Sequence, residues 1–271
     1  KVKNSKKISF INLDLNKNIS KDKLPINIDI VIYSAGYIGG VESLKNNNIN
    51  KYFKLNLYSL SNLLENIDIS KLKKIIFFSS EQVYGDNQIN FDKKKKIFFE
   101  PRPKNYYGAS KLIAEKYLYY FYCSNKKKFN VDILRIPRVI DYSKDNLIYK
   151  LLNYCSLKKK INISNINERF NFIFISDFLN LINQSLKQKK KIYRILDLGS
   201  KDYRSFNIFE IVKKIDKVLK TKTDISFSNR STHNPVNLKI NYDYSNKSLN
   251  LNSQVCITKM IQLIKNKYGF K

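Results

Sequence analysis

The chain contains few of the residues that build metal centres, disulfide frameworks and histidine-based catalytic sites. Its 271 residues include three cysteines and one histidine. Cys123, Cys155 and Cys256 form no close pair with ligand spacing, which predicts reduced core thiols. A single histidine, His233, excludes a metal cluster or a catalytic triad built on several histidines. We therefore predict no metal site.

Acidic residues are also scarce, because 51 Lys+Arg stand against 22 Asp+Glu and give a formal net charge of +29. Such a charge invites a nucleic-acid or anionic-membrane hypothesis. However, the excess of positive charge is almost all lysine. Asn, Ile, Tyr and Phe are also abundant, and all five residue types have A/T-rich codons, so a biased base composition explains the excess. Lysine runs such as 93–96 and 158–160 fall between predicted elements, where solvated loops explain them. We predict no nucleic-acid partner, and salt-dependent retention on DNA would test the alternative.

Long apolar runs are missing as well. No stretch reaches membrane-spanning length, and no signal-like apolar segment opens the sequence. This predicts a cytoplasmic protein with no membrane partner.

What the chain does contain is an alternation of apolar strand patterns with helical patterns. Strands are predicted at 8–13, 28–34, 74–79, 131–136 and 193–197. Helices are predicted near 50–66, 107–124, 146–156, 177–188, 206–219 and 253–267. This alternation predicts an α/β fold.

One predicted helix carries a tyrosine and a lysine four residues apart, Tyr107 and Lys111. Both side chains then lie on one face, where the ammonium lowers the phenol pKa by favouring phenolate. A free tyrosine titrates near ~10, so it needs such help to act as a base at neutral pH. Ser80, at the end of an apolar strand, could donate a further hydrogen bond. The pattern predicts a general acid/base.

The surrounding sequence resembles the extended short-chain dehydrogenase/reductase family, the NAD-dependent sugar-nucleotide epimerases and dehydratases. Members show a strand ending in Ser-Ser or Ser-Thr, then Val-Tyr-Gly, then Tyr-Gly-x-Ser-Lys, as residues 78–85 and 107–111 do here. Further similar segments lie at 29–36, 54–65, 134–137, 169–177 and 196–200. The resemblance implies a Rossmann-like doubly wound parallel sheet with a smaller C-terminal substrate lobe. The expected domains are 1–140 and 141–271, with strands returning to the first around 172–197.

One family feature has no counterpart here. Members begin with a strand, a Gly-x-x-Gly-x-x-Gly turn and a helix, which let backbone amides approach the cofactor pyrophosphate. Gly36 and Gly39 have the wrong spacing, and residues 8–15 resemble the family's third strand. We therefore expect the first strand, helix and second strand to be missing. Their loss would expose unpaired strand edges, so such a fragment should fold poorly alone.

The resemblance also implies roles for particular residues. Tyr107 would exchange a proton with a sugar hydroxyl, Lys111 would lower its pKa and hold the nicotinamide ribose, and Ser80 would bond the same sugar oxygen. The catalytic candidates are Ser80, Glu81, Tyr107 and Lys111. The candidates for binding NAD or NADP are Asp14, Leu15, Ser34, Ala35, Gly36, Asn56, Tyr107, Lys111 and Pro137. The candidates for binding a nucleotide-sugar are Ser80, Glu81, Gln82, Arg138, Arg169 and Arg230.

The reaction implied is epimerisation or 4-ketoreduction of a nucleotide-sugar, in surface-polysaccharide sugar synthesis. The 4,6-dehydratases carry an Asp-Glu pair where this chain has Glu81 and Gln82, and an amide cannot act as an acid. This weakens dehydration, which stays an alternative, as does a catalytically inactive binding or regulatory relative. The choice between NAD and NADP depends on the missing second strand. A homodimer through the helices near 50–66 and 107–124 is a further family expectation.

Overall fold

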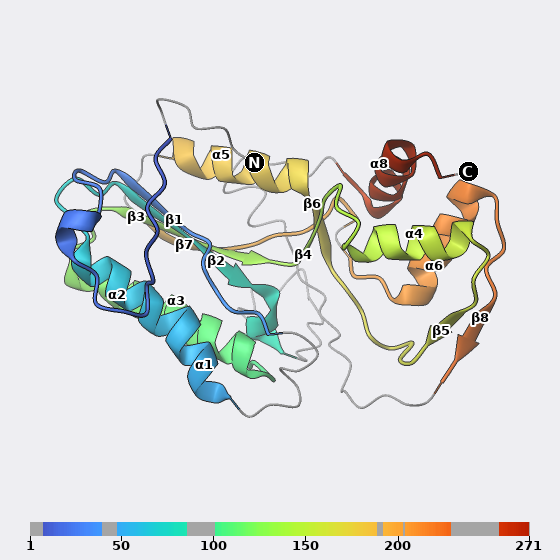
Figure 1. Ribbon diagram of the computed structural model, residues 1–271, viewed down its shortest axis with the longest axis horizontal. Helices are drawn as coiled ribbons and strands as arrows, with labels where there is room; N and C mark the ends of the chain where they lie inside the picture. The colour runs from blue at the N-terminus through green and yellow to red at the C-terminus, as the bar shows by residue number, and fades with distance from the viewer. Residues whose placement is uncertain are drawn as a thin grey trace, which may run out of the picture. The chain divides into compact units, whose positions relative to one another are not determined.

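The computed structural model describes residues 8–39, 48–85, 101–188, 192–202, 204–228 and 255–270. The chain forms two compact units (Figure 1). The first unit comprises Lys1–Phe78, Asn105–Ile133 and Lys190–Arg194, and the second comprises Ser79–Lys104, Leu134–Lys189 and Ile195–Lys271. The expected division of the domains at residue 140 stays a prediction.

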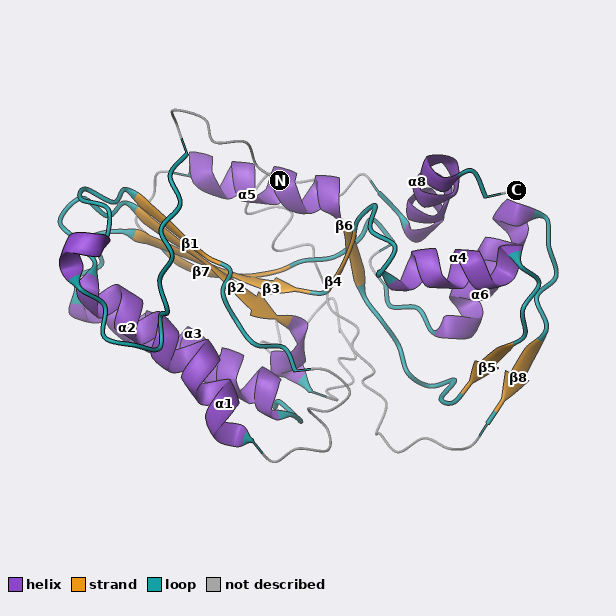
Figure 2. Ribbon diagram, viewed as in Figure 1, coloured by secondary structure: helices purple, strands orange, loops and turns teal. Residues whose placement is uncertain are grey.

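A four-stranded sheet has the strand order β1-β2-β3-β7. Its strands are β1 (Ile30–Tyr33), β2 (Lys74–Ser80), β3 (Asn130–Ile136) and β7 (Tyr193–Asp197). β1 and β2 are parallel, with Val31 opposite Ile75. Nearly all of β2 is buried, as its continuous apolar run requires. With the helices drawn in Figure 2, the sheet confirms the predicted α/β class.

The strand expected over 8–13 is wrong, because residues 8–14 have no regular secondary structure. Extended backbone becomes a strand only when a neighbour satisfies its N–H and C=O groups. No described strand pairs with this segment. β1 is an edge of the described sheet, and its Ile30 and Ile32 are 41% and 45% exposed.

In the first unit, one predicted helix is divided into three consecutive parts. They are α1 (Ile49–Phe53), the π-helical turn η3 (Lys54–Tyr58) and α2 (Ser59–Asn66). The long helix α3 (Tyr106–Ser124) packs against η3. Asn105 caps α3, because its side chain accepts a hydrogen bond from the Gly108 amide at 2.7 Å. The cap starts the helix immediately before Tyr107.

The second unit contains short strands, and only the one over 172–174 lies where strands were expected, around 172–197. β4 (Arg138–Ile140) pairs in parallel with β6 (Phe172–Phe174), and β5 (Ile161–Ile163) with β8 (Ile225–Phe227). Each has three residues, which is too short to display an alternating pattern. Two short 3-10 helices, η1 (Lys21–Lys23) and η4 (Glu81–Tyr84), complete the minor elements.

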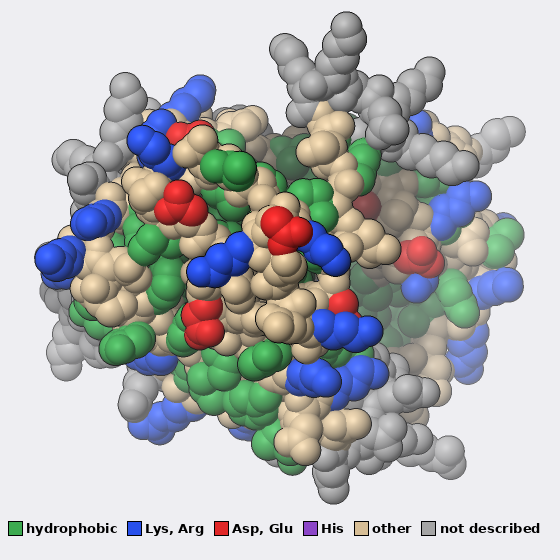
Figure 3. All heavy atoms as spheres, turned by 60° about the vertical axis from the view of Figure 1, so that its left-hand side comes forward, with side chains coloured by type: hydrophobic (Ala, Val, Ile, Leu, Met, Phe, Trp, Pro, Cys, Tyr) green, Lys and Arg blue, Asp and Glu red, His purple; other side chains and the backbone are tan. Residues whose placement is uncertain are grey.

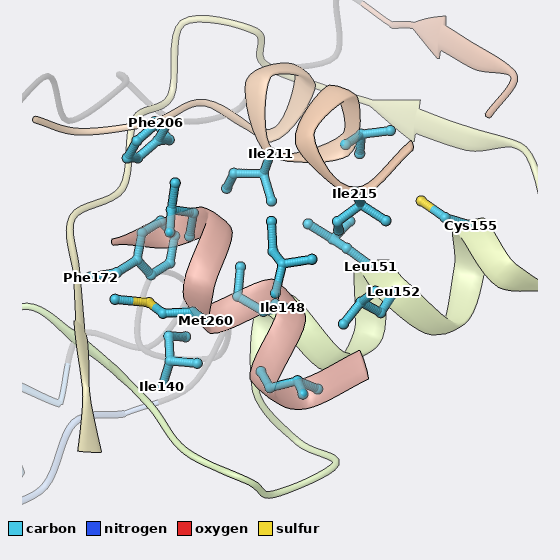
Figure 4. Packing of buried hydrophobic residues seen from close by; sticks show 14 of the residues in the cluster. Ile140, Ile148, Leu151, Leu152, Cys155, Phe172, Phe206, Ile211, Ile215 and Met260 are labelled. Atoms are coloured by element: carbon cyan, nitrogen blue, oxygen red, sulfur yellow. The ribbon is translucent and has the colours of Figure 1, made fainter. Parts of the chain in front are cut away.

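The core of the second unit is formed by helices α4 (Leu147–Ser156), α6 (Ile208–Leu219) and α8 (Ile257–Tyr268) with residues of β4 and β6. Figure 4 shows Ile148, Ile211 and Met260 packed together in it. Helix α6 begins with a capping box, in which Asn207 and Glu210 bond each other's backbone amides. Helix α5 (Ile175–Lys187) follows β6 directly.

No described helix is both long and apolar enough to cross a membrane. The described His, Cys, Asp and Glu residues include no group that could hold a metal ion, and the three cysteines are free. On the face shown in Figure 3, Lys and Arg side chains are dispersed among hydrophobic and neutral ones rather than gathered in one patch.

Candidate active site

Lys111 lies one turn after Tyr107 on α3, inside the first unit. Its side chain is buried, and its Nζ donates a hydrogen bond of 2.9 Å to the Phe78 carbonyl of β2. The same Nζ is 6.0 Å from the ring centroid of Tyr107 and 4.9 Å from that of Phe77. The helical spacing therefore places the cation beside the phenol, and β2 holds the cation in place.

Burial controls the charge of Lys111. Desolvation lowers the pKa of its ammonium to about 8, and the negative charge of Glu115 opposes this effect. At neutral pH the group is therefore still mainly a cation. Above pH 8 it is mainly neutral and no longer favours an ionised phenol.

Gly36 lies next to this lysine, and the Asn56 side chain lies next to Gly36. Asn56 is completely buried in η3, and its side chain accepts from the Tyr37 amide at 2.5 Å and donates to the Tyr37 carbonyl at 2.9 Å. A Cβ added to Gly36 would lie 3.0 Å from Lys111 Nζ and 3.1 Å from Asn56 Oδ1. A side chain at this position would therefore require Lys111 or Asn56 to shift by a few tenths of an ångström. The neighbouring candidates Ser34 and Ala35 are exposed beyond β1.

The second unit holds Ser80 and Glu81, at the end of β2. The Ser80 Oγ accepts a hydrogen bond of 3.2 Å from the Gln82 amide and caps η4. Glu81 is buried and accepts a hydrogen bond of 2.9 Å from Asn171 Nδ2.

Burial raises the pKa of Glu81 to about 7. The hydrogen bond from Asn171 and the charge of Arg138 oppose this rise, while the negative charge of Asp197 adds to it. A carboxyl group with this pKa can hold or release a proton near neutral pH.

Tyr84, from the Val-Tyr-Gly motif, connects three segments of the second unit through hydrogen bonds. Its hydroxyl donates to the Asp197 carboxylate at 2.8 and 2.9 Å and accepts from Arg135 Nη1 at 2.6 Å. Burial raises the pKa of this phenol, so it remains protonated. Sequence reasoning did not single out Asp197 or Asn171. Both lie in segments that resemble the family, and that signal could have found them.

The remaining cofactor candidates are Asp14, Leu15 and Pro137. Asp14 is exposed and forms a turn, in which its Oδ1 accepts from the Asn16 amide at 3.0 Å. This hydrogen bond lowers the pKa of its carboxyl group. The Leu15 carbonyl accepts from Asn62 Nδ2 at 2.8 Å. Pro137 is buried between β3 and β4.

Three arginines were predicted to bind substrate. The Arg138 guanidinium lies 4.6 Å from the ring centroid of Phe170. Arg169 forms an ion pair of 2.9 Å with Glu210. Arg230 lies outside the described residues, as does His233.

Comparison with known proteins identifies related sequences. The "NAD dependent epimerase/dehydratase family" matches residues 1–199. A dTDP-D-glucose 4,6-dehydratase of Dictyostelium discoideum is 29% identical over 201 residues, covering 69% of this chain and 44% of that protein. An uncharacterized UDP-glucose epimerase of Bacillus subtilis is 23% identical over 215 residues, covering 78% of this chain and 65% of that protein. The chain thus spans less than two thirds of the length of either relative.

The fold has solved counterparts. The structure of MoeE5 in complex with UDP-glucuronic acid and NAD superposes with a TM-score of 0.76 at 18% identity, covering 93% of this chain and 82% of that one. At this identity the likeness shows the fold alone, a parallel α/β sheet of the same kind. The family match, in contrast, extends over more than half of the sequence. The chain therefore belongs to the NAD-dependent epimerase/dehydratase family.

Proposed function

We propose that the chain is a nucleotide-sugar epimerase or 4-ketoreductase, in which Tyr107 exchanges a proton with a sugar hydroxyl. One observation carries the proposal. The buried Lys111 ammonium lies 6.0 Å from the Tyr107 ring and is fixed by the Phe78 carbonyl. A cation in this position favours the phenolate, which is the form that can accept a proton.

The residues around Lys111 fit the nicotinamide end of NAD or NADP. An ammonium has three N–H donors, and the Phe78 carbonyl accepts one of them. The others can bond ribose hydroxyls. Gly36 is exposed, so a ligand can approach its backbone next to Lys111. When bound, the cofactor supplies a hydride acceptor and donor.

The protein's own part is the movement of one proton. As the sugar C–H hydrogen leaves as hydride, the hydroxyl on the same carbon loses its proton to Tyr107 and becomes a carbonyl. In the reverse direction Tyr107 returns the proton. We propose that Ser80 hydrogen-bonds the same sugar oxygen. An epimerase would return the hydride to the opposite face, whereas a reductase would release the oxidised cofactor.

A specific observation supports a 4,6-dehydratase as the second candidate. Glu81 is buried with a pKa of about 7, so it can act as an acid or a base at neutral pH. Eliminating water needs a further acid/base in addition to Tyr107. Gln82, in the adjacent position, cannot serve as that group.

The experiment is to incubate the purified chain with NAD(H) or NADP(H) and a panel of nucleotide-sugars, and to follow the sugars by NMR. An epimerase interconverts two sugars without net change in the cofactor. A reductase consumes reduced cofactor, and a dehydratase releases water and forms a 4-keto-6-deoxy sugar. We expect Tyr107→Phe to lower turnover by about 10²- to 10⁴-fold.

Two controls decide the outcome. Tyr106→Phe changes the neighbouring, exposed tyrosine and should leave turnover unchanged. Binding of NADH to wild type and to Tyr107→Phe, measured by nicotinamide fluorescence, separates lost chemistry from lost binding. Cofactor binding without turnover of any sugar would favour an inactive binding or regulatory relative. If the protein is folded but binds no cofactor and turns over no sugar, the proposal is contradicted.

A further inference from the structure

Ser110 lies on α3 between Tyr107 and Lys111 and is completely buried. Its Oγ donates a hydrogen bond of 2.8 Å to the Tyr107 carbonyl and accepts one of 2.9 Å from Asn56 Nδ2. The first bond is local, and serines in helices often make it. The second joins residues 54 positions apart in the sequence, so it ties α3 to another element.

Asn56 is well suited to make this connection. It lies in a π-helical turn, a rare conformation that often occurs at functional sites. Both N–H groups of its amide are used, one by the Tyr37 carbonyl and one by Ser110, and its oxygen accepts from the Tyr37 amide. A continuous hydrogen-bonded chain therefore runs from the loop after β1 through Asn56 and Ser110 to the carbonyl of Tyr107.

These hydrogen bonds lie close to Gly36 and Lys111. The Gly36 backbone leaves only 3.0 Å between a hypothetical Cβ and Lys111 Nζ, and 3.1 Å between that Cβ and Asn56 Oδ1. A small shift of α3 toward the loop would move Lys111 toward the Gly36 backbone. A small shift away would move Tyr107 and Lys111 together from the loop. Buried, fully used hydrogen bonds resist both shifts, because breaking one leaves a polar group without its partner.

We propose that Ser110 is a positioning residue, which together with Asn56 holds the Tyr107–Lys111 turn of α3 at a fixed distance from the loop that follows β1. The inference rests on the proposed function, since it assigns Ser110 to the same proton-transfer site. Ser110 itself exchanges no proton with a substrate.

The test compares Ser110→Ala with a matched control, Ser59→Ala. Ser59 is also buried, and its Oγ donates to the Leu55 carbonyl at 2.8 Å and lies 2.6 Å from the Tyr33 hydroxyl. Each serine thus bonds a backbone carbonyl three or four positions before it in the sequence and one side chain of another element. The control removes a similar pair of hydrogen bonds from α2 and leaves the Asn56–Ser110 bond intact.

We expect Ser110→Ala to lower kcat/KM by about 10- to 100-fold, because small displacements of catalytic groups are costly. Ser59→Ala should stay within about twofold of wild type, with a similar loss of thermal stability. The pH midpoint of Tyr107 ionisation should rise only in Ser110→Ala, since a displaced Lys111 favours the phenolate less. That midpoint is obtained from the phenolate absorbance difference between each variant and its Tyr107→Phe counterpart.

The double variant Asn56→Ala with Ser110→Ala should be little worse than Asn56→Ala alone, because the two residues act through one bond. Wild-type kcat/KM and an unchanged Tyr107 titration in Ser110→Ala would overturn the inference. If wild type turns over no nucleotide-sugar, the proposed function fails, but the titration of Tyr107 still decides the role of Ser110.

Discussion

At the scale of the residue, Glu81 links burial to the pH dependence of stability. Its pKa is raised from 4.5 to about 7, so the folded protein retains a proton that the unfolded chain releases. This contribution to stability is fully present below the unfolded pKa and is lost as pH rises through about 7. The whole loss is on the order of 3 kcal/mol. We expect the free energy of unfolding of wild type, relative to Glu81→Gln, to fall over this window.

Urea unfolding of both proteins at a series of pH values measures the difference. All other ionisable groups are shared, so their titration cancels in the comparison. A difference in unfolding free energy that stays constant across the window would contradict the prediction. Asn171→Ala is informative as well, because its hydrogen bond to Glu81 lowers the pKa of the carboxyl group. Without it, the window should extend to higher pH.

Residue-scale sequence reasoning predicted the relation of Tyr107 to Lys111 because both lie within one helical turn. It did not predict the roles of Ser110, Asn171 or Asp197. The contacts of these side chains join segments far apart in the sequence, such as Asn171 to Glu81 across 90 positions. Local spacing carries no information on such pairs. They became visible only once the fold brought the segments together.

At the scale of the element, three neighbouring strands share a buried cluster of charges. Asp132 of β3 binds Arg194 of β7 through two hydrogen bonds of 2.7 Å, and Lys74 of β2 lies 3.4 Å from the same carboxylate. All three side chains are buried. Burial lowers the pKa of Lys74, and the charge of Asp132 opposes this effect. The three charges meet only in the observed register of the strands. A slipped register would separate Asp132 from its two cations and is therefore disfavoured.

We expect Asp132→Asn to destabilise the protein by about 3–5 kcal/mol, because two buried cations lose their common anion. Lys74→Met should be milder, since it leaves the bidentate pair of Asp132 and Arg194 intact. Urea midpoints of the two variants measure the contrast. Equal destabilisation by both would show that the carboxylate is not the centre of the cluster.

Long elements were predicted better than short ones. The strand over 74–79 and the helix over 107–124 correspond to β2 and α3 to within one residue. A long apolar or periodic run predicts its element well because the pattern depends little on any single residue. The segment 8–13 has the composition of a strand but no described partner, and hydrogen bonds to a neighbour cannot be read from composition. The π-helical turn η3 was also beyond prediction, since its sequence continues the pattern of the flanking helices.

At the scale of the whole molecule, the exposed apolar stripe of α3 bears on the expected homodimer. Tyr106, Ile113 and Tyr120 recur at seven-residue intervals, which places them on one face of the helix. They are 37%, 41% and 69% exposed. A monomer normally covers contiguous apolar surface, and a second copy of the same helix can cover this stripe in an isologous contact. We propose that the helices of two chains pack along it.

The prediction is tested by measuring the mass of the protein in solution with light scattering after size-exclusion chromatography. Wild type should be a dimer, and Ile113→Glu combined with Tyr120→Glu should be a monomer, because four carboxylates would then face one another across the contact. Ile26→Glu is the matched control, since Ile26 is 84% exposed but lies outside α3. It should leave the dimer intact. A monomeric wild type, or a double variant that remains dimeric, would place the contact elsewhere or exclude it.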